Sequence, residues 1–137
     1  MTPEQHILLI EDDDIDALTV RRTLKELGAP NPLDRVTDGE RALAFLRSPA
    51  WPRPGLMLLD LNMPRMNGIE FVTEIKRDPV LRLIPVVVLT TSVEEGDRMA
   101  AFSNSVAGYM VKPVEYPQFV RVMGLIRDYW MTSSTPP

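Results

Sequence analysis

The sequence predicts an α/β protein in which helices cover both faces of a five-stranded parallel sheet. Short apolar runs alternate with amphipathic stretches along the whole chain, which is the pattern of repeated strand–helix units. Two of these runs, Leu56–Leu59 and Val86–Leu89, lack the alternation with polar residues that a half-exposed strand shows. Strands of this kind are buried on both faces, so we expect these two near the centre of the sheet.

Five apolar runs are candidates for the strands. Each is short and is bounded by polar, glycine or proline residues, as strands in compact domains are. The second run is the weakest of the five. The predicted strands are His6–Ile10, Leu33–Val36, Leu56–Leu59, Val86–Leu89 and Gly108–Val111.

Amphipathic stretches between these runs predict five helices. In the first, apolar residues from Ala17 to Leu27 recur at a spacing close to 3.6, and Gly28 ends the helix. Pro49 and Pro79 end the second and third helices, because proline cannot continue a helix. The remaining predicted helices are Gly39–Arg47, Ile69–Arg77, Glu94–Val106, and a last one from about Pro117 to Trp130.

The length of 137 residues suits one compact domain. We find neither a repeat nor a linker in the sequence. We therefore expect a single domain over residues 1–131, followed by a flexible, polar and proline-ended tail over residues 132–137.

Composition and charge exclude several classes of function. The net charge of -4 and the absence of a Lys/Arg run disfavour direct binding to nucleic acid. The chain has no cysteine and a single histidine, His6, which excludes thiolate metal sites and makes a serine–histidine triad implausible. Since no apolar run reaches the roughly 18 residues of a membrane span, and the amino terminus is not signal-like, we expect a cytoplasmic protein away from the membrane.

Polar side chains collect where the predicted strands end. In an open parallel sheet, ligands bind outside the carboxyl ends of the strands. Glycines or hydroxyls in the first of these loops would indicate a nucleotide or flavin phosphate, but that loop is acidic here. The residues that follow the strands are Glu11 and Asp12, Asp60 and Asn62, Thr90, Thr91 and Ser92, and Lys112.

These residue types indicate a magnesium-dependent phosphoryl acceptor. Glu11, Asp12 and Asp60 would repel one another, and hard oxygen ligands without His or Cys suit Mg²⁺. A metal ion would also neutralise the approach of the Asp60 carboxylate to an anionic phosphoryl group. Thr90 and Lys112 would then donate to the transferred oxygens.

Several of these residues also have ordinary structural interpretations. Asp13 or Asp14 would cap the first helix, and Asp16 would be a plain surface residue. Thr91 and Ser92 are equally well read as loop hydroxyls. Tyr109 is a core aromatic in the simplest interpretation.

Taken together, the motifs resemble those of the receiver domains of two-component response regulators. They are Glu11-Asp12, Asp60 within Leu-Leu-Asp-Leu-Asn-Met-Pro, Asn67-Gly68, Thr90-Thr91 and Lys112-Pro113, in this order. The resemblance covers nearly the whole chain. It implies a flavodoxin-like, doubly wound sheet of order 2-1-3-4-5 flanked by five helices.

The resemblance also implies a role for each site residue. Glu11 stands where Asp is commoner in the family, and Val114 stands where many receivers have Phe. The Lys112-Pro113 bond resembles one that is cis in such domains. The implied roles are Asp60 as phosphoacceptor; Glu11, Asp12, Asp60 and the backbone carbonyl of Asn62 as metal ligands; Lys112 as the partner of the phosphoryl oxygens; and Thr90 and Tyr109 as the switch pair.

A finer resemblance links the chain to single-domain regulators that partner phytochrome-type histidine kinases. It lies in Arg77-Asp78-Pro79, Ile84–Ser92, Lys112-Pro113-Val114, Phe119 and Asp128-Tyr129-Trp130-Met131. The last helix also carries more apolar residues than one small core needs, namely Met123, Tyr129, Trp130 and Met131. We therefore expect a homodimer through the fourth helix, fifth strand and fifth helix.

The expected function is that of a phosphoacceptor response regulator in a two-component phosphorelay. It would take a phosphoryl group from a histidine kinase, with a bacterial phytochrome as the candidate, on Asp60 and signal by conformational change. We do not expect an enzyme, since the protein would catalyse only its own Mg²⁺-dependent phosphotransfer. Two alternatives stay open. A magnesium-dependent aspartyl phosphatase would have a second Asp at the position of Asn62, and a pseudo-receiver would lack a residue of the pocket.

Overall fold

A parallel sheet forms the centre of the computed structural model, which describes residues 1–136. Its five strands run in the order β2-β1-β3-β4-β5, which confirms the predicted sheet and its order. The first strand begins one residue later than predicted. The strands are β1 (Ile7–Ile10), β2 (Leu33–Val36), β3 (Leu56–Leu59), β4 (Val86–Thr90) and β5 (Gly108–Val111).

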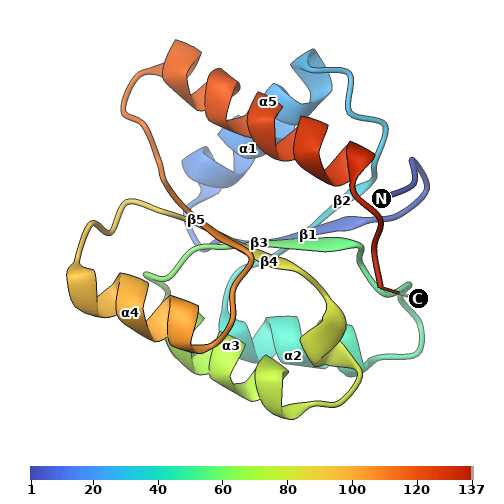
Figure 1. Cartoon of the computed structure of the whole chain (residues 1–137), viewed down its shortest axis with the longest axis vertical. Helices are drawn as coiled ribbons and strands as arrows, with labels where there is room; N and C mark the ends of the chain where they lie inside the picture. Colours follow the sequence, from blue (N-terminus) through green and yellow to red (C-terminus); the bar gives the residue numbers. More distant parts are fainter. Residues whose placement is uncertain (137) are drawn as a thin grey trace.

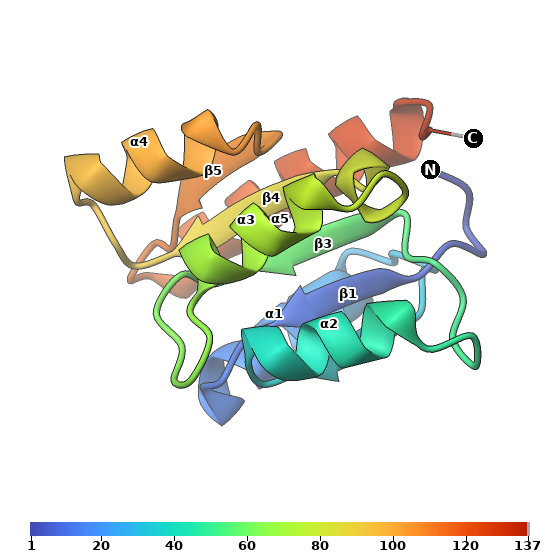
Figure 2. The same cartoon turned by 90° about the horizontal axis from the view of Figure 1, so that it is seen from below.

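Helices cover both faces of this sheet, as Figures 1 and 2 show. Two helices lie on one face, α1 (Asp14–Glu26) and α5 (Tyr116–Thr132). Three lie on the other, α2 (Gly39–Arg47), α3 (Gly68–Arg77) and α4 (Glu95–Ser103). A short 3₁₀ helix over Leu81–Leu83, which the sequence did not predict, connects α3 to β4.

The apolar strands divide their side chains between two hydrophobic cores. Leu8 and Ile10 of β1 pack with Phe71 beneath α2, α3 and α4, whereas Leu9 packs with Phe119 beneath α1 and α5. The neighbouring strands β3 and β4 divide their residues in the same way. Burying such a side chain contributes about 1.5–3 kcal/mol. Because helices cover both faces of the sheet, side chains on either face of these strands are buried, which explains why the apolar runs are continuous.

Side-chain caps fix where the helices begin. The Asp13 carboxylate accepts from the backbone N–H of Asp16 at 2.9 Å, which confirms the predicted cap of α1. At the start of α3, Asn67 and Glu70 form a reciprocal capping box. Gly28 has a φ of +70° just after α1, in the left-handed region that favours glycine.

Three details of the sequence prediction are corrected. Helix α4 ends at Ser103, three residues before Val106, because the chain turns at Ser105 with a φ of 58°. Helix α5 continues to Thr132, beyond Trp130. The Lys112–Pro113 bond is trans, since no peptide bond in residues 1–136 is cis; trans is the more stable form by about 0.5–1 kcal/mol.

Helices α5 and α4, which flank β5 on opposite faces of the sheet, differ in how much apolar surface they bury. Helix α5 buries Phe119, Met123 and Ile126. Helix α4 buries a single small side chain, Ala101, and exposes Phe102. The surface made by α4 is therefore held to the sheet by little apolar contact.

Both ends of the described chain lie together, as Figure 1 shows. The amino-terminal ammonium donates to the carbonyl of Ser133 at 2.5 Å, and the amide of Gln5 donates to the hydroxyl of Thr135 at 3.3 Å. Residue 137 of the predicted tail lies outside the described residues. None of the helices in residues 1–136 is long and apolar enough to cross a membrane.

Candidate functional site

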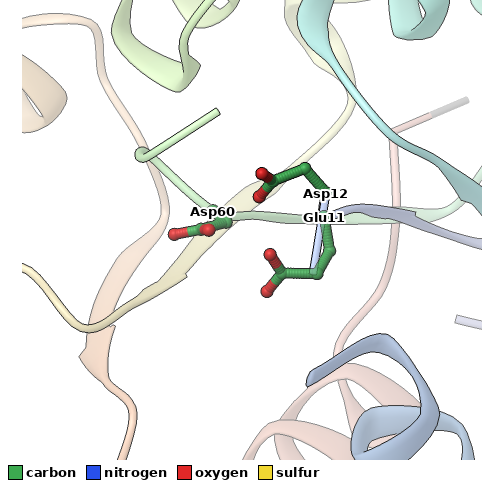
Figure 3. A group of neighbouring side chains, drawn as sticks. All are labelled: Glu11, Asp12 and Asp60. Carbon is green, nitrogen blue, oxygen red and sulfur yellow. The ribbon is translucent and has the colours of Figure 1, made fainter. Parts of the chain in front are cut away.

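Three carboxylates meet at the carboxyl ends of β1 and β3. Figure 3 shows the side chains of Glu11, Asp12 and Asp60 pointing into a common space. One oxygen of each lies within 4.8 Å of the others. The backbone amide of Asp60 donates to the carbonyl of Ile10 at 3.0 Å, so the continuing sheet ladder aligns the two loops. The acidic cluster expected from the sequence is thus formed.

Burial is uneven within this cluster. Glu11 is 1% exposed and Asp60 is 7% exposed, while Asp12 reaches the surface. Burial, together with the hydrogen bond and charge of Asp60, raises the pKa of Glu11 from 4.5 to about 7, although the hydrogen bond from Lys112 acts in the opposite direction. The site therefore holds more negative charge than its own residues neutralise.

Lys112 is the cation that faces these carboxylates. Its ammonium hydrogen-bonds Glu11 and, at 2.9 Å, Asp16, and it lies 3.9 Å from a carboxylate oxygen of Asp60. Burial alone would lower the pKa of Lys112, but hydrogen bonds to Glu11 and Asp16 outweigh burial and raise it. The side chain therefore remains an ammonium at neutral pH.

This contact corrects the prediction for Asp16. We expected a plain surface residue, yet its carboxylate ion-pairs with Lys112 across 96 positions of sequence. The cause is tertiary: the first turn of α1 packs beside the end of β5, where the backbone amide of Lys112 donates to the carbonyl of Thr90 at 2.7 Å.

The hydroxyl residues after β4 form a connected network. The buried Thr90 hydroxyl accepts from the backbone N–H of Ser92 at 3.3 Å, and the Tyr109 hydroxyl donates to the carbonyl of Ser92 at 3.1 Å. The Ser92 hydroxyl in turn donates to Asp97 at 2.5 Å. Thr91 is exposed and lines a groove beside Lys112. Ser92 thus connects Thr90 to Tyr109.

The loop after β3 is shaped by Gly68. A Cβ at this position would lie 2.5 Å from the carbonyl oxygen of Asp60 and 2.7 Å from the Cα of Leu61, so only glycine permits this approach. In the same loop, the backbone amide of Asn62 lies 3.4 Å from a carboxylate oxygen of Asp60, and the Asn62 side chain is exposed.

Sequence reasoning missed two residues near the site. Arg35 donates to the carbonyl of Glu11 at 2.9 Å and to the carboxylate of Asp14 at 2.7 Å. Asp38 caps α2 by accepting from the backbone N–H of Arg41. Each of these residues had a signal in the sequence. Arg35 lies near the end of an edge strand, and Asp38 directly precedes Gly39, where the second helix was predicted to begin.

The donor set fits a divalent cation. Within residues 1–136, three carboxylates face one another, Lys112 alone supplies a nearby ammonium, and all the candidate ligand atoms are oxygens. Such a set is typical of Mg²⁺, Mn²⁺ or Ca²⁺ sites.

Comparison with protein families shows the family to which the chain belongs. A family model described as the response regulator receiver domain matches residues 7–123. The chain belongs to the response regulator receiver family. The acidic cluster lies at the carboxyl ends of the strands of this matched region, so the resemblance inferred from the motifs is confirmed.

Curated relatives and solved structures support the same assignment. Response regulator Rcp1 of Synechocystis is 38% identical over 98% of this chain and 95% of that protein. A probable methanogenesis regulatory protein, FilR2 of Methanothrix harundinacea, is 37% identical over 96% of this chain and 86% of that protein.

Two crystal structures cover almost all of both chains. The phosphorylated cyanobacterial phytochrome response regulator RcpA has a TM-score of 0.92 at 34% identity, over 98% of this chain and 99% of that one. The Mn²⁺-bound form of Rcp1 has a TM-score of 0.90 at 38% identity, over 97% and 99%. The protein is a response regulator of the two-component type, similar to phytochrome response regulators.

Proposed function

We propose that Asp60 is the phosphoacceptor and that Glu11, Asp12, Asp60 and the backbone carbonyl of Asn62 hold Mg²⁺. The observation that carries this proposal is the convergence of three carboxylates on a pocket with one buried ammonium. The Mn²⁺-bound structure of Rcp1 supports a divalent cation in a relative. When bound, Mg²⁺ supplies neutralisation of the negative charge that otherwise opposes transfer.

In the proposed reaction, a carboxylate oxygen of Asp60 attacks the phosphorus of a kinase phosphohistidine. The phosphorus–nitrogen bond breaks as the phosphorus–oxygen bond to Asp60 forms, and the imidazole leaves. Lys112 and Thr90 donate to the phosphoryl oxygens. The protein catalyses only this transfer to itself.

The proposed output begins at Thr90. Turning its hydroxyl toward the phosphoryl group removes the acceptor of the Ser92 backbone amide. The Tyr109 hydroxyl donates a hydrogen bond to the carbonyl of Ser92, so the loop that contains Ser92 and the side chain of Tyr109 rearrange together. The lightly anchored α4 then changes between two states.

The proposed partner is a sensor histidine kinase of the phytochrome type. Its class is supported by the similarity to RcpA, which is a phytochrome response regulator. The fully exposed Val114 lines the groove beside Lys112, and α1, which contributes Asp16 and Thr19 to that groove, exposes Ile15 and Leu18 by 76% and 65%. Apolar residues in this position suit the packing of helices from a partner.

We also propose a homodimer through α4, β5 and α5. A groove of about 460 Å³ runs between β5 and α5 and is lined by Met110, Leu125, Tyr129 and Trp130. Met123, by contrast, is fully buried, so it adds nothing to an exposed surface. Light scattering with and without phosphorylation tests this: a dimer mass is expected, and a monomer mass in both states contradicts it.

We propose residues 1–131 as the receiver domain, followed by a tail from residue 132, although α5 itself runs to Thr132. The protein works in the cytoplasm, by contact with other proteins and without binding nucleic acid or membrane.

The deciding experiment measures intact mass after incubation with acetyl phosphate. The wild type is expected to gain one phosphoryl group with Mg²⁺ and none with EDTA. Asp60→Asn is expected to gain none in either condition, because the attacking oxygen is lost. Folded wild-type protein without an adduct would instead favour a pseudo-receiver.

A further inference from the structure

Lys112 contacts three carboxylates unequally. Its ammonium hydrogen-bonds Glu11 and Asp16, while the nearest oxygen of Asp60 lies at 3.9 Å. This last distance is too long for a hydrogen bond. In the structure, therefore, the ammonium is held away from the residue whose phosphoryl group it is expected to bind.

Asp16 differs from the other two partners in exposure. Its side chain is 42% exposed, whereas the side chains of Glu11 and Asp60 are 2% and 8% exposed. Its backbone is fixed by the cap, since the amide of Asp16 donates to Asp13 at 2.9 Å. Asp16 is thus held firmly in place but can be solvated again at little cost when Lys112 leaves it.

We propose that Asp16 is a positioning residue that holds the Lys112 ammonium in the resting protein and releases it when Asp60 is phosphorylated. The inference rests on the proposed function, in which Lys112 binds the phosphoryl oxygens. Asp16 thereby competes with the phosphoryl group for one cation, and this competition slows the transfer.

Asp16 is the specific competitor because it is not one of the proposed metal ligands. When a metal cation binds, the negative charge of Glu11 is shared between that cation and Lys112, so Glu11 attracts Lys112 less strongly. Asp16 has no positive partner among the described contacts, apart from Lys112 itself. An ammonium has three N–H donors, of which Glu11 and Asp16 accept two, so what the Asp16 ion pair opposes is movement of the nitrogen from its position 3.9 Å from Asp60 toward phosphoryl oxygens there.

Removing the charge of Asp16 is therefore expected to speed phosphorylation. Asp16→Asn should raise the maximal rate with acetyl phosphate about fivefold, the size of a partly exposed ion pair. The Mg²⁺ concentration for half-maximal rate should stay unchanged, because Asp16 does not bind the metal. Asp16→Glu, whose longer arm still reaches Lys112, should behave like the wild type.

A matched control is Asp14→Asn. It removes the same charge from the same helical turn, but Asp14 pairs with Arg35 and does not contact Lys112. Its rate is expected to equal that of the wild type. An equal acceleration in both variants would mean that overall charge matters rather than the Lys112 contact, and would overturn the inference.

A second readout is independent of phosphorylation. The nitrogen chemical shift of the Lys112 ammonium, measured by NMR in the unphosphorylated protein at fixed pH, should change in Asp16→Asn and not in Asp14→Asn. An unchanged shift overturns the inference. If the wild type takes no phosphoryl group, the proposed function fails, and the Lys112 shift still decides whether Asp16 holds the ammonium.

Discussion

The buried carboxylate of Asp38 and the buried carboxylates of Glu11 and Asp60 all follow strand ends at one edge of the sheet, but their charges are balanced in opposite ways. Asp38, with a side chain 4% exposed, caps α2 and has Arg41 and Arg65 each at 3.6 Å. In the pocket, Glu11 and Asp60 are as well buried, but they share a single ammonium with Asp16.

The difference distinguishes a structural carboxylate from a functional one. Asp38 has an excess of positive partners and a cap to form, so its negative charge stabilises the fold. The pocket has an excess of negative charge, which costs folding energy and favours a bound cation. Burial by itself identifies neither role; the balance of charge around each group does.

Among changes that test this difference in charge balance, the largest loss of stability is expected from Lys112→Met. Removing the ammonium leaves the buried Glu11 and Asp60 without their cation, which should lower the free energy of unfolding by about 3 kcal/mol near pH 8. Mg²⁺ should restore part of the loss. Urea unfolding with and without Mg²⁺ measures both. Lys25→Met, on the exposed last turn of α1, serves as the control, and an equal loss there would contradict this account.

An intermediate effect is expected at Asp38. Asp38→Ala removes the cap and the partner of two arginines, and should lower the free energy of unfolding by about 2 kcal/mol. Asp38→Asn retains a capping oxygen and should lose less. Thermal unfolding measures the order of the two. Neither variant should alter Mg²⁺ affinity, and a change in that affinity would show that the two carboxylate groups are coupled.

The smallest effect is expected from pH. Since the pKa of Glu11 is raised from 4.5 to about 7, Mg²⁺ binding must displace a proton below pH 7, and the affinity for Mg²⁺ should fall about tenfold between pH 8 and pH 6. Calorimetric titration of the wild type from pH 8 to 6 measures this change. Equal affinities across that range would contradict it.

The same shift predicts the opposite trend without metal. A carboxyl group whose pKa is higher in the folded protein stabilises that state below pH 4.5, and the contribution is lost as pH rises through about 7. The metal-free protein should therefore gain stability on mild acidification from pH 8. In Glu11→Gln this gain should shrink, because the titrating group is absent.

The sequence predicted the fold almost entirely because local signals and burial agree. The apolar runs of β3 and β4 could be placed between two helical layers because they do not alternate with polar residues. The end of α4 was misplaced because the turn at Ser105 depends on a left-handed backbone conformation, for which serine is no signal.

The site was predicted less completely, since its members come from separate strand ends. Motif order brought Glu11, Asp12 and Asp60 into one cluster, which the structure forms. The contacts of Asp16 and Arg35 depend on how α1 and β2 pack against neighbouring loops. Such packing leaves no pattern in the spacing of residues, so Asp16 was taken for an ordinary surface charge and Arg35 was not singled out.

The shallow anchoring of α4 sets the cost of sending a signal. Because only Ala101 of this helix is buried, moving the helix exposes little apolar area, on the order of 1 kcal/mol for one methyl-sized side chain. A single aspartyl-phosphate can supply energy on that scale through two or three redirected hydrogen bonds. In the proposed mechanism, displacing α4 disturbs the core beneath α2, α3 and α4 only where Ala101 packs, and it leaves the core beneath α1 and α5 closed.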